Sequence, residues 1–132
     1  MAKQPCPNGT TIVFACSGGA NVGQVANQAA VDLHREGIGS MLCLARVSNC
    51  NEDMPAESRD AERIVGIDGC SAACARKTLE QAGLPPTDHV VVTDLGLEKK
   101  IHDGILDTKI VTRVKNAVKA RLESIAGGPF CS

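Results

Sequence analysis

Residues 63–83 read RIVGIDGCSAACARKTLEQAG, in which a short apolar run is followed at once by a segment with helical periodicity. The run at 63–68 predicts a buried strand, and the segment at 70–83 predicts a helix that a glycine terminates. A strand that leads directly into a helix is the repeating unit of α/β folds. Two cysteines, Cys70 and Cys74, are four positions apart in this segment, so we expect them on one face of the first helical turn.

The same unit recurs on both sides of this stretch. Apolar runs predict further strands at 11–15, 40–47 and 88–96, and apolar stripes predict helices at 21–37 and 107–126. Asp107 or Thr108 is the expected N-cap of the last helix. Residues 1–10 are predicted to be an irregular lead-in and residues 48–60 a loop, so residues 1–132 are expected to form a single domain.

Strands that alternate with helices predict right-handed crossovers and a mainly parallel sheet of about four strands, with helices on both faces. The expected fold class is therefore a Rossmann-like, doubly wound α/β domain. In such sheets ligands bind beyond the carboxyl ends of the strands. Candidate functional residues are therefore sought where each strand ends.

The composition excludes several classes of partner. The 132 residues carry a net charge of −1 and include no Trp or Tyr, which argues against nucleic acid as a partner. No apolar run approaches the length of a membrane-spanning helix, and the first residues lack the apolar centre of a secretory signal. We therefore expect a cytoplasmic protein. Seven cysteines, an odd number, do not suggest a disulfide framework in that compartment.

Four of the cysteines converge on one edge of the predicted sheet. Cys16 follows the first strand, Cys43 lies in the later half of the second, and Cys70 and Cys74 follow the third. Four converging thiolates suit tetrahedral zinc. The alternative is that these cysteines are small buried core residues, and the spacing Cys-x₃-Cys alone does not decide between the two.

At these positions the sequence resembles the DGC-motif family, small proteins described as zinc-binding and named for a stretch like Asp68-Gly69-Cys70. The matching segments are FACSGGANVGQVANQAA, MLCLA, IDGCSAACARKTLEQAG and VVVTDLG. The resemblance implies zinc as the cofactor and four cysteine ligands, which map to Cys16, Cys43, Cys70 and Cys74. In CLARVSNCNED, Cys50 is an alternative to Cys43. Cys6 and Cys131 fall in the expected tails and are interpreted as incidental.

Three functions are compatible with these residues. The first is a cytosolic zinc-binding protein that senses or carries a metal or thiol, whose partners are the metal ion and a small thiol or soft anion. The second is a thiol enzyme of sulfur transfer or disulfide exchange, with Cys70 or Cys16 as nucleophile and Cys74 as resolving thiol. The third is an iron–sulfur protein on the same cysteines. A phosphatase-like loop after Cys16 is disfavoured because Val22 stands where such loops carry arginine.

Polar residues near the same edge have two interpretations each. Asp68 and Asp94 are candidate hydrogen-bond acceptors for the ligands, a general base or a further ligand. Otherwise Asp68 is a solvated loop residue and Asp94 caps a turn. His89 begins the fourth predicted strand and is expected at the opposite edge of the sheet, whereas His102 is a candidate lid residue.

Overall fold

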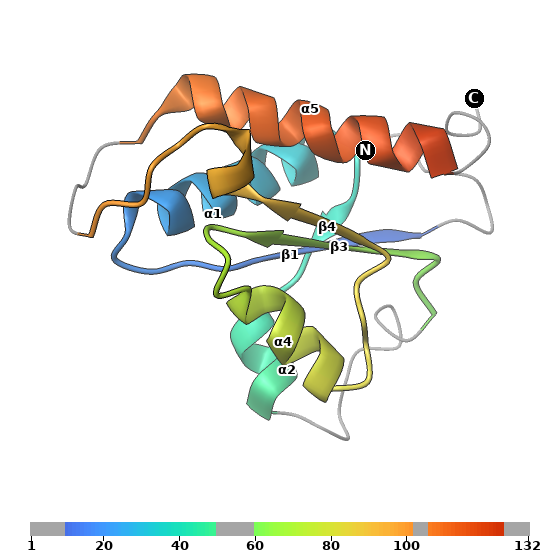
Figure 1. Ribbon diagram of the computed structural model, residues 1–132. Helices are drawn as coiled ribbons and strands as arrows, with labels where there is room; N and C mark the ends of the chain where they lie inside the picture. Colours follow the sequence, from blue (N-terminus) through green and yellow to red (C-terminus); the bar gives the residue numbers. More distant parts are fainter. Residues whose placement is uncertain (1–9, 50–59, 102–105, 126–132) are drawn as a thin grey trace.

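A computed structural model describes residues 10–49, 60–101 and 106–125 (Figure 1). In chain order the elements are β1 (Thr11–Ala15), α1 (Asn21–Arg35), β2 (Ser40–Met41), α2 (Leu44–Asn49), β3 (Arg63–Asp68), α4 (Cys74–Gln81), β4 (Asp88–Val91), the 3₁₀ helix η1 (Val92–Leu95) and α5 (Thr108–Ile125). The alternation of strands and helices predicted from the sequence is confirmed.

All the paired strands run parallel, in the order β2-β1-β3-β4. The central strands β1 and β3 pair from Thr11↔Arg63 to Ala15↔Ile67. On its other side, β3 pairs with β4 from Val65↔Asp88 to Asp68↔Val91. Every strand therefore ends at the same edge of the sheet. The predicted parallel α/β domain of four strands is confirmed.

Helices cover both faces of the sheet. Figure 1 shows α1 and α5 on one face and α2 and α4 on the other. In β1 the side chains alternate, so Val13 and Ala15 join the larger core beneath α1 and α5, while Ile12 and Phe14 join the smaller core beneath α2 and α4. The cores are almost entirely aliphatic, as expected for a chain with two Phe and no Trp or Tyr.

A buried ion pair ties the amino ends of two strands to the last helix. The guanidinium of Arg63 donates to both carboxylate oxygens of Asp88, with Nη2 at 2.8 Å from each. Thr87 Oγ donates to the same carboxylate at 2.8 Å. Arg63 also reaches the carbonyls of Arg121 and Leu122 near the end of α5, each at 3.5 Å. Strand order and helix docking are thus fixed together at this edge, opposite the carboxyl ends.

The second predicted strand, at 40–47, is wrong in extent. Only Ser40 and Met41 pair with β1, and the chain enters α2 at Leu44. Leu44 and Val47, three positions apart, lie on the side of α2 that packs into the smaller core. A short apolar run satisfies a strand or one face of a helix equally well, and periodicity cannot separate the two.

The fourth predicted strand, at 88–96, is also too long. β4 ends at Val91, and η1 follows at once. The Thr93 N–H donates to the Gly69 carbonyl at 3.2 Å, so the 3₁₀ turn stays attached to the chain beyond the end of β3. Gly96 then takes the left-handed conformation at φ 105° that ends the 3₁₀ turn.

The last predicted helix agrees with the structure within two residues at each end, because α5 covers Thr108–Ile125. Asp107 is its cap, since Oδ1 accepts from the N–H groups of Lys109 and Ile110. The predicted lead-in at 1–9 and residue 126 lie outside the described residues. Within the described residues, no helix has the length and apolar character needed to cross a membrane.

Candidate thiol site

A pocket of about 400 Å³ opens beyond the carboxyl ends of β1 and β3. There the loop after β1 leads to α1 on one face of the sheet, while the loop after β3 leads to α4 on the other face. The two connections therefore diverge from neighbouring strands (Figure 1). This divergence is the topological switch point at which parallel sheets bind ligands. The lining comprises Cys16, Ser17, Gly18, Gly19, Ala20, Val22, Gly23, Gly69, Cys70, Ala72, Cys74, Lys99 and Ile101. Three of the four predicted thiols therefore share one pocket.

Cys16 is the most firmly held of the three. Its N–H donates to the Ile67 carbonyl at 2.9 Å, which continues the β1–β3 ladder by one residue. Its Sγ accepts from the N–H of Gly69 at 3.0 Å. The pKa of the Cys16 thiol is raised to about 11, mainly by burial and in smaller part by the nearby Asp68, although the Gly69 N–H opposes the shift. Cys16 is therefore a neutral thiol at neutral pH in the metal-free protein.

This protonation state predicts an order of alkylation. With a pKa of about 11, only about one Cys16 thiol in a thousand is ionised at pH 8, and the thiolate is the reactive form. In metal-free protein we expect iodoacetamide to label the exposed Cys43 and Cys74 first, and Cys16 last. The rate at Cys16 should keep rising as the pH is raised toward 11. Peptide mass spectrometry measures these rates, and equal labelling of Cys16 and Cys74 at pH 8 would contradict this assignment.

Cys70 and Cys74 do not share a helical face, so that prediction is wrong. Residues 70–73 form a turn, closed by the Ala73 N–H donating to the Cys70 carbonyl at 3.0 Å, and α4 begins only at Cys74. Ala73 takes the left-handed conformation at φ 53°, a strained arrangement for a residue with a Cβ. The strained turn places Cys70 at the end of β3 and Cys74 at the start of α4, both on the pocket.

Asp68 explains why the helix starts late. Its carboxylate is 1% exposed and accepts from the N–H groups of Ala75 at 2.7 Å and Arg76 at 3.1 Å. It therefore caps α4 from the preceding strand. It also bonds His89 Nε2 at 2.8 Å, so His89 reaches the carboxyl end of β3 and is not at the opposite edge of the sheet. The solvated-loop interpretation of Asp68 is wrong.

The glycine between Asp68 and Cys70 is in close contact with the start of α1. A Cβ on Gly69 would lie 2.9 Å from Gly23 N, from Val22 C and from Val22 Cγ2. Gly23 is itself pressed against the loop after β1, because a Cβ there would lie 3.2 Å from Gly18 N. These two glycines let the loops that carry Cys16 and Cys70 meet at backbone distance.

Residues 98–101 close one side of the pocket, a contact that no local sequence pattern predicts. The Asn21 side chain donates to the Glu98 carbonyl at 2.9 Å and accepts from the Lys100 N–H at 2.7 Å. The Asn21 N–H donates to the Lys100 carbonyl at 3.0 Å, and an antiparallel bridge joins Ala20 to Ile101. We call residues 98–101 the strap. It places Lys99 Nζ 3.5 Å from Cys70 Sγ.

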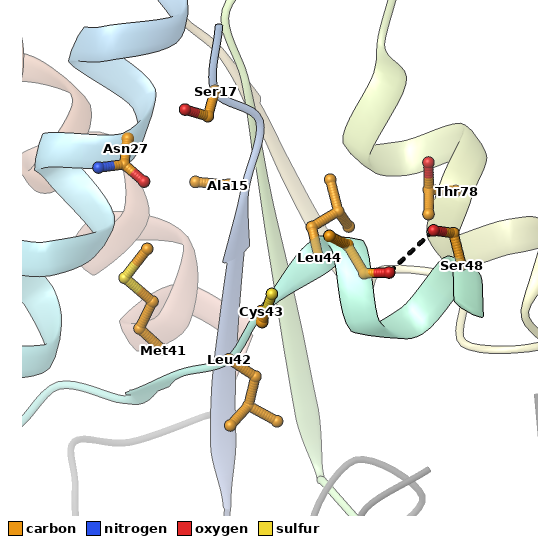
Figure 2. A pocket seen from close by; sticks show the side chains of 10 residues that line it. Ala15, Ser17, Asn27, Met41, Leu42, Cys43, Leu44, Ser48 and Thr78 are labelled. Atoms are coloured by element: carbon orange, nitrogen blue, oxygen red, sulfur yellow. Dashed lines mark hydrogen bonds between the residues drawn. The ribbon is translucent and has the colours of Figure 1, made fainter. Parts of the chain in front are cut away.

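Cys43 lies elsewhere, contrary to its predicted place within a strand. It is exposed, between β2 and α2, and lines a second pocket of about 570 Å³. Figure 2 shows it beside β1, between Met41 and Leu44, with Ser17 and Asn27 on the same pocket. Ser17 lines both pockets, so they are neighbours at the same sheet edge.

Other residues named from the sequence are not in the thiol pocket. Asp94 is exposed in η1 and is not among the residues that line it. Cys50, Cys6, Cys131 and His102 lie outside the described residues.

The three thiols are the kind of ligand that a soft metal prefers, but in this structure they are not close enough together to hold one. In the described ranges, no three Cys, His, Asp or Glu side chains are close enough together to hold an ion as they stand. Cys74 is exposed and Cys70 half-buried, so their side chains are free to turn. A change of χ1 rotamer moves a cysteine sulfur by about 3 Å. The donor set of Cys16, Cys70 and Cys74 is of the kind that binds zinc and other soft ions.

Comparison with known proteins places this site in a family context. The DGC domain model matches residues 12–118, which include all three thiols of the pocket and Cys43. A relative from Pseudomonas aeruginosa, the anaerobic and virulence modulator AnvM, is 34% identical over 89 residues, which span 67% of this chain and 68% of that protein. No solved structure matches the chain. The resemblance noted in the sequence is confirmed, and the chain belongs to the DGC domain family.

Proposed function

We propose that this protein binds zinc through the thiolates of Cys16, Cys70 and Cys74. The observation that carries the proposal is that these three thiols, from the loops after β1 and β3, line one pocket at the switch point of the sheet. Three protein ligands with one open position are typical of zinc sites that exchange a ligand. Cys43 completes the set only if the segment between β2 and α2 moves toward Ser17.

Charge balance supports this donor set. Three thiolates and one Zn²⁺ carry a net charge of −1, and Lys99 supplies a positive charge beside Cys70. Cys16 must lose its proton on binding, so zinc affinity is expected to rise with pH.

An exchangeable site suits a sensor or a carrier better than a purely structural role. The open position accepts a small thiol or a soft anion, and the strap lies beside it. The name of the Pseudomonas relative describes that protein as an anaerobic and virulence modulator. A site whose ligands are reduced thiols would link metal loading to the redox state of the cytoplasm, where we propose that the protein acts.

The test is the zinc content of protein purified without oxygen. We expect about one zinc per chain in the native protein and a large loss in Cys70→Ser and Cys74→Ser. The matched controls, Cys6→Ser and Cys131→Ser, should keep their zinc. Equal zinc content in all four variants would overturn the proposal, and iron with acid-labile sulfide in place of zinc would point to a cluster on the same thiols.

One observation favours a second function, thiol chemistry at Cys70. The Lys99 ammonium lies 3.5 Å from Cys70 Sγ, and Cys74 lines the same pocket as a resolving thiol. Disulfide exchange that persists in metal-free protein and is abolished in Cys70→Ser would favour this function over zinc binding.

A further inference from the structure

The thiol pocket offers three sulfur donors, a number that suits an element with a different charge and coordination from zinc. Three thiols line it, and the fourth predicted ligand, Cys43, lines the neighbouring pocket. Zinc bound by three thiols keeps an open fourth position that a further ligand must fill. Trivalent arsenic and antimony are complete with three sulfur ligands, because a lone pair occupies the remaining position. We propose that Cys16, Cys70 and Cys74 bind trivalent arsenic or antimony, presented as the neutral hydroxide.

The electrostatics of the pocket favour a neutral ligand. Its lining contains no Asp or Glu, and its one charged residue is Lys99. The amino end of α1 adds a partial positive charge at Val22 and Gly23. A neutral trihydroxide brings no charge into the pocket, and its tris-thiolate product is also neutral, so no unpaired charge is buried.

The reaction balances without an oxidant or a base. Each thiol forms one sulfur–arsenic bond, and its proton leaves with one hydroxyl group as water. Three such exchanges convert the trihydroxide and three thiols into the tris-thiolate and three waters. No electrons are transferred.

The way each sulfur is held suits this ligand. Cys16 Sγ is fixed by the Gly69 N–H at 3.0 Å and gives a stationary first ligand. Cys70 and Cys74 flank it from the turn and from the first residue of α4 and are more exposed, so each is free to turn toward the bound atom. One ligand fixed by the sheet and two adaptable ligands allow a pyramidal arrangement to form without moving β1 or β3.

The test uses the full, reduced, metal-free chain and sodium arsenite. Native mass spectrometry should find one arsenic per chain with the loss of three hydrogens, and four of the seven thiols should stay reactive. A sulfur-to-arsenic absorption band should appear in the near ultraviolet, which is clear because the chain has no Trp or Tyr. Cys74→Ser, at an exposed position, should weaken binding at least tenfold, or about 1.4 kcal/mol, with an unchanged circular dichroism spectrum.

Two sets of variants separate this proposal from zinc binding. Cys43→Ser and the triple variant Cys6→Ser/Cys50→Ser/Cys131→Ser should bind arsenite as the native chain does. Lys99→Gln should weaken zinc by about two- to fivefold, as for a partly exposed charge pair, and leave arsenite unchanged. Lys100→Gln, whose side chain is outside the pocket lining, is the control and should leave the binding of both zinc and arsenite unchanged. Arsenic bound through only two thiols, or lost in the Cys43 or triple variant, would overturn the proposal whatever the zinc result.

Discussion

Replacing Asp88 with alanine should lower the free energy of unfolding by about 3–5 kcal/mol, because it leaves a buried guanidinium without its carboxylate. The side chains of Arg63 and Asp88 are 10% and 1% exposed. Two carbonyls of α5 at 3.5 Å remain near the guanidinium, but neither supplies a counter-charge. Urea denaturation followed by circular dichroism measures the loss.

A double variant separates the charge effect from the loss of contacts. Arg63→Met/Asp88→Leu replaces both charges with apolar groups of similar size, and paired replacements of this kind often restore stability. Thr87 Oγ keeps an acceptor in this variant, because it also bonds the Ile64 carbonyl at 3.2 Å. The double variant should therefore be more stable than Asp88→Ala. If it is less stable, the ion pair contributes more than the cost of burying its charges.

Gly69→Ala should destabilise the fold by about 1–3 kcal/mol, the usual cost of overpacking, and should also weaken metal binding. Two of the three atoms 2.9 Å from the added methyl group are backbone atoms of the first turn of α1. They cannot move aside unless the helix shifts, and such a shift separates the loops that carry Cys16 and Cys70. Thermal unfolding and zinc titration of the same samples measure the two effects.

Gly66→Ala is the matched control, since it adds the same methyl group three positions earlier, in β3. There the nearest atoms would be 3.5–3.7 Å away, which is ordinary van der Waals contact. Loss of a glycine restricts the unfolded chain, so we expect unchanged or slightly higher stability and unchanged zinc binding. Equal losses in the two variants would show that the close approach at Gly69 has no special role.

The sequence predicted best where one face or both faces of an element are buried. The limits of β3 are those predicted, 63–68, because the buried residues between Arg63 and Asp68 include no polar side chain that interrupts the pattern. The stripe of α1 from Val22 to Leu33 is likewise the one that packs in the larger core. The edge to which Cys16 and Cys70 belong followed from these elements alone.

Predictions failed where a distant contact decides the local conformation. The late start of α4 depends on the carboxylate of Asp68, which caps Ala75 and Arg76 across the turn. Cys43 was misplaced because MLCLARV suits a strand as well as a helix. Asn21 and Lys99 were missed altogether, since their contacts join residues 77 and 29 positions apart and no local pattern encodes them.

The strap forms one side of the pocket, and it can detach locally while the sheet and the hydrophobic cores stay folded. Three hydrogen bonds to Asn21 and the bridge from Ala20 to Ile101 hold it, and it adds no residue to either hydrophobic core. Segments held in this way exchange their amide hydrogens through fluctuations far smaller than global unfolding. The Lys100 amide should therefore exchange faster than the amides of β1. We therefore expect a ligand to enter and leave through local opening of the strap while the sheet stays intact.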